Sequence, residues 1–571
     1  MLANPAKAYN QAVVFNFFRS RFGRAGRVVA GAGLSFALLF TALARAQNQS
    51  SAASAASEAE HAGQGRILLV LPFENHTGQL SLDWIREAAA ELLNSRFTSA
   101  GFAPLSREDR VYALDHLGLP QGFDPSRASA IRLAQTLDAD EIVVGSFSMN
   151  GQDLVADAQL VDVPHLRMTK PVSTSGKLVD MIAIFDSLAW KLTKELDPDF
   201  SVAEKTFIAA GANLRLDAFE QYIRGITEPV QSERLQHLEA AVKLSPDFSP
   251  AWMALGREEY STEQYDKAAE AFAKVDHSGP DGLEAGFYRG LSLLFSGNYA
   301  AAEKSFADVA RVLPLAEVLN NEGVAISRQG HDGTSLFVRA AAADPNTADY
   351  HFNLAVSLKH HGNTTAALSQ MAECLKLHPG DSEAQNVLAA WKAESTQAGA
   401  HATTTTANAN PNPDPLERIV RTFDAAAFRQ AGAVLDQMDA ARLAALPAPE
   451  RATKLCSEAK GYLNRGLVLE AERLYQSALS ADSNVAAAHA GLAEVRFRTG
   501  DMEAARKQAN EALKLDPSAD AYLVLSRVDL AAGRLAEAAS ENSQALKLEP
   551  ANQAAQELQK QIQARESQTK E

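Results

Sequence analysis

The sequence is poor in cysteine and in positive charge. It has two cysteines, Cys374 and Cys456, and neither belongs to a pair with the spacing of metal ligands. Both lie in apolar helical patterns, which favours buried thiols, but the sequence does not show whether they are free or meet in a disulfide. Lysine and arginine number 54 against 70 aspartates and glutamates, which leaves a net charge of −16. That deficit argues against sequence-independent nucleic-acid binding, because such binding neutralises phosphates with cationic side chains.

The common catalytic motifs are also missing from the sequence. There is no nucleophile elbow, no HExxH and no CxxC. His76 and the pair His360-His361 have no nucleophile or further ligand at motif spacing, so exposed polar positions are the expected reading. The stretch Phe73–Leu80 joins a strand to a helix, as a phosphate-binding loop does, but it holds one glycine and no lysine. We therefore expect no catalytic residue, cofactor or metal, and an enzyme with an undetected site remains a third hypothesis.

One apolar run follows a basic N-terminal segment. Val28–Ala44 comes after four arginines and ends in Ala44-Arg45-Ala46, the small-x-small pattern of a signal-peptide cleavage site. The run is short for a bilayer span, which needs about 20 apolar residues. We predict a cleaved signal peptide over residues 1–46 and export to the periplasm or beyond. The alternative is an uncleaved signal anchor that holds the protein on the inner membrane, facing the periplasm. Residues 47–64 are mostly small and polar, and we predict that they form a flexible tether.

A 34-residue period organises most of the chain. Pro246, Pro280 and Pro314 are spaced at this interval, and the stretch AWMALGREEYSTEQYDKAAEAFAKVDHSGP lies between the first two. It resembles the tetratricopeptide repeat (TPR), a pair of helices with the pattern W-x2-L-G…A-x3-F…P. The next copy is regular, a shortened copy reaches its proline early at Pro345, and a further copy ends at Pro379. Three more copies precede a polar C-terminal helix of the kind that caps a solenoid.

These copies divide the chain into two TPR arrays. We predict array 1 over residues 200–395, a flexible linker rich in threonine and Asn-Pro over 396–415, and array 2 with its capping helix over 416–571. Leu416–Leu446 is predicted to be helical, as an irregular repeat or a leading cap. The fold class is therefore mainly α, a TPR α-solenoid preceded by an N-terminal α/β domain with a mixed sheet.

The α/β domain is predicted over residues 65–199. A strand at Ile67–Leu71, a capping box at Ser106–Asp109, a helix start at Asp124-Pro125 and a hairpin through Asn150-Gly151 give a mixed sheet with helices. The strand ending in Pro72-Phe73 and the stretch Ala139-Asp140…Gly145 resemble the amino-terminal domain of TolB and the CsgG family, with Asp138 in place of the usual glycine. That resemblance implies an assembly or recognition module without catalytic residues.

The concave face of array 1 is the candidate partner-binding groove. In TPR proteins the first helix of each pair presents spaced residues to this face, which suits an amphipathic helix or an extended peptide. The alternative is that some of these side chains pack against neighbouring helices and do not contact a partner. Transfer of the repeat register selects Met253, Arg257, Tyr260, Phe287, Leu291, Leu294, Phe352, Val356 and Lys359.

These features predict an exported, non-enzymatic adaptor that binds other envelope proteins through the groove and the α/β domain. The alternative is a component of an outer-membrane transport, secretion or cell-wall assembly complex, which would form a homo-oligomer through the α/β domain. The expected partners are proteins or peptides and not nucleic acid, with membrane association only if the N-terminal segment stays uncleaved.

Overall fold

The computed structural model describes residues 66–120, 122, 126–399, 415–423, 438 and 440–570. The predicted signal peptide, the tether, and residues 400–414 of the predicted linker lie outside these ranges. No helix in the described ranges is both long enough and apolar enough to cross a membrane.

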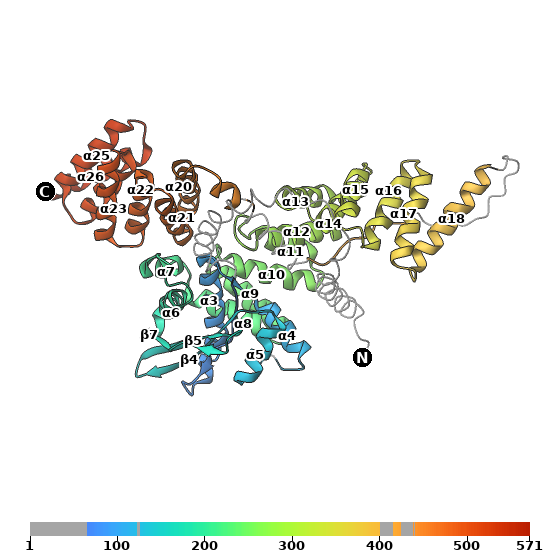
Figure 1. The fold of residues 1–571 in the computed structure, drawn as a ribbon, viewed down its shortest axis with the longest axis horizontal. Coiled ribbons are helices and arrows are strands. Elements are labelled where there is room, and N and C mark those ends of the chain that lie inside the picture. Colours follow the sequence, from blue (N-terminus) through green and yellow to red (C-terminus); the bar gives the residue numbers. More distant parts are fainter. Residues whose placement is uncertain are drawn as a thin grey trace, which may run out of the picture. The chain divides into compact units, whose positions relative to one another are not determined.

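A mixed sheet forms the N-terminal α/β domain (Figure 1). Its strands follow the order β3-β1-β4-β5-β6, while β2 pairs with β4 and β7 pairs with β5. The pairing of β1 with β3 and β4 is parallel, and β4 and β5 form an antiparallel hairpin. The strands are β1 (Ile67–Val70), β2 (Glu74–Asn75), β3 (Ala103–Pro104), β4 (Glu141–Asn150), β5 (Asp153–Asp162), β6 (Arg167–Met168) and β7 (Val172–Lys177).

The β4–β5 hairpin turns where the sequence predicts. Asn150 pairs with Asp153, and Gly151 at the turn has φ +65°, a left-handed conformation that glycine adopts without a Cβ penalty. On β4, Gly145 lies against Phe73, since a Cβ at this glycine would come within 2.3 Å of the phenyl ring. The two sequence motifs that hold these residues therefore meet in the core.

Helices cover both faces of the sheet because successive residues of a strand point to opposite sides. Leu68 and Val70 belong to a cluster with α3 and α6, whereas Leu69 and Leu71 belong to another with α4 and α5. The predicted capping box at Ser106 and Asp109 is present. The helix start predicted at Asp124-Pro125 lies outside the described residues, and α5 begins at Arg127 behind a Ser126 cap. These helices are α3 (Ile85–Ala100), α4 (Arg107–His116), α5 (Arg127–Thr136) and α6 (Met181–Leu196), with single 3-10 turns at Leu80–Leu82 and Leu178–Asp180.

Paired helices follow along array 1. The short α7 (Glu204–Gly211) packs on α6 and leads into the repeats. Array 1 ends with α18, which runs to Gly399, into the stretch that the sequence assigned to the linker. The helices are α8 (Leu216–Thr227), α9 (Gln231–Leu244), α10 (Ser249–Ser261), α11 (Tyr265–Phe272), α12 (Gly282–Phe295), α13 (Tyr299–Val312), α14 (Ala316–Arg328), α15 (Thr334–Ala343), α16 (Ala348–His360), α17 (Thr364–Leu377) and α18 (Ser382–Gly399).

Array 2 repeats the same unit. Its pairs are α20 with α21, α22 with α23 and α24 with α25, and α26 lies against the last pair. The helices are α20 (Ala448–Asn464), α21 (Val468–Ala481), α22 (Ala486–Arg498), α23 (Met502–Leu515), α24 (Ala519–Ala531), α25 (Leu535–Leu548) and α26 (Gln553–Lys570).

Small residues set the contact between the two helices of a pair. A Cβ at Gly256 or Gly290 would come within 2.7 Å of the ring of Phe272 or Phe306 on the second helix. Glycine is therefore required where the aromatic ring packs closely against the first helix. The two cysteines are buried and free, in separate hydrophobic clusters.

One expectation about the region after the linker is wrong. Leu416–Phe423, predicted as the start of a helix, forms neither helix nor strand. Its main-chain groups bond to side chains of array 1 in place of an i to i−4 ladder, as described below.

Candidate functional site

In three successive repeats, the first helix carries an equivalent residue on the same surface. This residue lies two positions before the small residue of the repeat. The three are Tyr288 before Gly290, Asn321 before Gly323 and Asn353 before Ala355. Because equivalent residues of stacked repeats lie side by side, α12, α14 and α16 present these three side chains as a row. Asn321 and Asn353 are fully buried.

Residues 416–423 of the same chain lie along this row. The Asn353 side-chain amide binds both main-chain groups of Arg418: Oδ1 accepts from the Arg418 N–H at 2.6 Å, and Nδ2 donates to the Arg418 carbonyl at 2.7 Å. Asn321 does the same for Val420, at 3.0 and 2.8 Å. Each side-chain amide makes the pair of main-chain hydrogen bonds that a neighbouring strand would otherwise make. Alternate residues of an extended chain present both groups to one side, so the segment is bound as an extended peptide.

Asn320 ties the two amides together. Its Nδ2 donates to the Arg418 carbonyl at 3.0 Å and to Asn321 Oδ1 at 3.2 Å, and its Oδ1 accepts from Asn353 Nδ2 at 2.7 Å. A buried amide network of this kind is stable when its groups have partners, and here the main chain of the segment supplies them.

The Arg418 side chain enters an acidic pocket at the end of the array. Its guanidinium donates to Asp349 at 2.8 Å, to Asp381 at 2.7 and 3.1 Å and to Glu383 at 2.8 Å. It also lies over the Phe352 ring, 3.7 Å from the centroid, an arrangement that suits a delocalised cation. Burial alone would raise the pKa of Asp381, but hydrogen bonds from Arg418 and the Ala384 N–H hold it below its ordinary value.

Further contacts hold both ends of the segment. The buried Glu417 side chain bonds to Ser327, and the main-chain carbonyl of Glu417 accepts a hydrogen bond from the Arg328 side chain at 3.1 Å. At the other end the Phe423 ring lies 5.6 Å from Phe287 and 6.3 Å from Tyr288, centroid to centroid. The segment therefore runs from α16 toward α12, opposite to the order of the repeats. The acidic pocket, the three asparagines and this aromatic pair are called the array 1 groove below.

The structure places the nine residues selected from the sequence in three settings. Phe287 and Phe352 contact the bound segment. Arg257, Tyr260 and Lys359 pair with other parts of the chain: Arg257 with Glu284 and Glu108, Tyr260 with Tyr265 and Tyr288, and Lys359 with Glu394. The remaining four are packed in hydrophobic clusters and are Met253, Leu291, Leu294 and Val356.

Sequence reasoning missed the polar residues of the groove. The signal for Asn321 and Asn353 is present in the sequence, because two successive repeats carry an asparagine two residues before their small residue. No comparable signal marks the acidic pocket, whose members come from two helices and the turn between repeats. Those omitted are Asn320, Asn321, Asn353, Asp349, Asp381 and Glu383.

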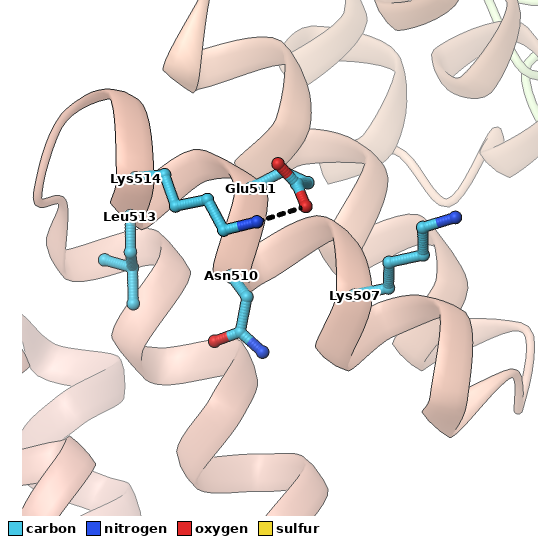
Figure 2. A pocket seen from close by; sticks show the side chains of 5 residues that line it. All are labelled: Lys507, Asn510, Glu511, Leu513 and Lys514. Atoms are coloured by element: carbon cyan, nitrogen blue, oxygen red, sulfur yellow. Dashed lines mark hydrogen bonds and ion pairs between the residues drawn. The ribbon is translucent and has the colours of Figure 1, made fainter.

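The histidines singled out from the sequence lie at exposed positions. His76 pairs with Glu74 at 3.0 Å on an exposed loop, and His361 lies 3.6 Å from Asp332. Within the described ranges no cluster of histidine, cysteine and acidic side chains has the arrangement of a metal site. A surface hollow on α23 is lined by side chains of that one helix, with an ion pair between Glu511 and Lys514 at 2.7 Å (Figure 2).

Comparison with known families identifies the repeats. A family model of the tetratricopeptide repeat matches residues 235–282 and 456–520, one stretch in each array. The chain therefore contains tetratricopeptide repeats, as the 34-residue period predicts. No curated protein sequence matches the chain.

Several solved structures are similar to parts of this chain. YrrB, a TPR protein with an unusual peptide-binding site, is 19% identical over 30% of this chain and 91% of its own, with a TM-score of 0.28. The LpoB C-terminal domain from Salmonella enterica is 25% identical over 20% of this chain and 84% of its own, with a TM-score of 0.18. The first TPR domain of human RPAP3 is 24% identical over 21% and 97%, with a TM-score of 0.20. None of the three extends to a third of this chain.

Proposed function

We propose that this protein is an exported scaffold that binds other proteins of the bacterial envelope through the array 1 groove. The observation that carries the proposal is the groove itself, which holds an extended stretch of main chain through the Asn321 and Asn353 amides. Those contacts do not depend on the side chains of the bound segment, so the same groups suit a peptide from another protein.

The envelope location rests on the N-terminal sequence. The basic segment, the apolar run and the Ala-x-Ala pattern over residues 1–46 favour export with cleavage, and an inner-membrane anchor is the alternative. The α/β domain, by its TolB-like motifs, would supply a second partner surface. Fractionation of cells that express the full chain tests this part: recovery from cytoplasm alone would contradict export.

Capture from an envelope extract tests the scaffold role. The full chain is compared with an Asn321→Ala, Asn353→Ala variant and with Asn510→Ala, a matched control at an exposed position on α23. We expect at least one partner that the control retains and the groove variant loses, and that binds the purified full chain directly. Retention of every partner by the groove variant would move recognition to the α/β domain. Absence of any partner would contradict the scaffold role, and a ring-sized oligomer would favour the transport or assembly complex.

A further inference from the structure

The array 1 groove separates contacts that any peptide can make from contacts that select a sequence. The three asparagines bind main-chain groups of Arg418 and Val420, which every residue except proline offers. Selection comes from three side-chain contacts. An acidic side chain, here Glu417, bonds to Ser327 and pairs with Arg328 at 3.7 Å. An arginine enters the acidic pocket, and an aromatic ring lies against Phe287 and Tyr288. Ile419 and Val420 add half-buried aliphatic contacts between the arginine and the aromatic ring.

We propose that the array 1 groove binds extended peptides of the pattern Glu-Arg-aliphatic-aliphatic-x-x-aromatic, and that residues 417–423 are an exchangeable intramolecular occupant which such a partner peptide displaces. This inference rests on the proposed function, since it names the ligand chemistry and the regulation of the same groove.

The charge of the pocket supports a basic ligand. Asp349, Asp381 and Glu383 contribute three negative charges, and Arg418 supplies one positive charge among them. Asp381 is nearly buried, with 7% of its side chain exposed, and an unpaired carboxylate there would lose much of its hydration. The pocket therefore selects arginine, whose planar guanidinium donates to several carboxylates at once.

The mode of attachment supports exchange. The segment is bound by side chains of array 1 and adds no strand or helix to the fold. Leu416, Arg421 and Thr422 remain exposed. A tethered occupant of this kind competes at an effective concentration of the order of millimolar. For a free peptide with an intrinsic Kd near 10 µM, that competition weakens apparent binding about 100-fold.

The test measures how a labelled synthetic peptide of residues 415–423 binds three full-length proteins. The first is the unaltered chain, the second carries Arg418→Ala and Val420→Pro, and the third adds Asn321→Ala and Asn353→Ala. The proline removes the N–H that Asn321 accepts, so the second protein releases its own segment while the groove stays intact. Arg311→Ala, at an exposed site on α13, controls for the loss of an arginine. A peptide with Arg418→Glu tests the acidic pocket.

Fluorescence anisotropy distinguishes the outcomes. We expect the peptide to bind the second protein on the order of 10- to 100-fold more tightly than the first, and to lose binding to the third. The Arg418→Glu peptide should bind none of them. Equal, tight binding to the first and second proteins would leave the groove as a peptide site but refute the intramolecular occupant. Failure of the second protein to bind, with its helical circular dichroism unchanged, would refute the groove as a peptide site and with it the proposed function.

Discussion

At the scale of single residues, the close approach at Gly290 makes a matched pair of predictions. A Cβ there would come within 2.7 Å of the Phe306 ring, whereas Gly461 on α20 has open space around it. We expect Gly290→Ala to lower the free energy of unfolding by about 1–3 kcal/mol through overpacking. Gly461→Ala should raise it by about 0.4–1 kcal/mol, because alanine restricts the unfolded chain and favours helix. Urea unfolding of the full chain measures both, and the same sign for the two variants would contradict the packing argument.

Glu141 is a residue whose effect on stability depends on pH. It lies opposite Asp162 across the β4–β5 pair, and burial, followed by the charge of Asp162, raises its pKa from 4.5 to about 7. The folded state therefore binds this proton more tightly than the unfolded state does. That contribution to stability is complete below about pH 4.5 and is lost as the pH rises through about 7.

The substitution Glu141→Gln tests this dependence. Glutamine carries no charge opposite Asp162, so we expect a higher Tm than the unaltered protein at pH 8 and a smaller difference at pH 5. Glu503→Gln, on the exposed face of α23, serves as the control. A Tm difference of equal size at both pH values would show that Glu141 does not titrate in this range.

At the scale of elements, α26 acts as the cap of array 2. Its Ala555, Leu558 and Ile562 are buried in one cluster with residues of α24 and α25, while its other face is polar and exposed. Ile562→Ala should cost about 2–5 kcal/mol, because the fully buried side chain leaves a cavity. In a repeat array the loss falls first on neighbouring helices. Hydrogen exchange should quicken in α24–α26 and not in α10–α13, and the exposed Gln561→Ala should change neither.

The elements that the sequence predicts correctly are those whose geometry depends on near neighbours. The 34-residue period identifies the helix pairs because Gly256 and Phe272, or Gly290 and Phe306, must meet within one repeat. The β4–β5 hairpin likewise depends on a local turn at Gly151. Leu416–Phe423 begins the Ala-rich stretch Leu416–Leu446, which the sequence predicts to be helical. Its conformation instead depends on Asn321 and Asn353, distant in sequence, which no local pattern connects to it.

At the scale of the whole molecule, array 2 shares a core with the α/β domain. Leu469 of α21 belongs to the same hydrophobic cluster as the sheet, α3 and α6, and this cluster continues through α8–α10. Beside it the buried Glu472 accepts hydrogen bonds from the Ala203 N–H at 3.0 Å and from Arg496 at 2.9 Å, and it also bonds to Thr206. The two ends of the described chain are therefore coupled through α7 and α21.

This coupling predicts the unfolding of the full chain. Glu472→Gln leaves Arg496 without its buried anionic partner, and loss of one member of such a pair typically costs about 3–5 kcal/mol. We expect calorimetry to resolve an earlier transition for array 2 in this variant than in the unaltered protein, with faster hydrogen exchange in both α7 and α21. Glu503→Gln again serves as the control. Exchange that quickens in α21 alone would show that α7 does not depend on this contact.

The array 1 groove and the segment that it binds belong to one polypeptide, so a single gene encodes both. A substitution that weakens the acidic pocket, such as Asp381→Lys, can be compensated by a reciprocal change at Arg418 within the same gene. A genetic screen for suppressors of a pocket variant should therefore recover intragenic second-site changes in residues 417–423. In related sequences the charge at position 381 and the charge at position 418 should change together. A partner peptide is encoded by another gene, which would have to change separately to match both positions.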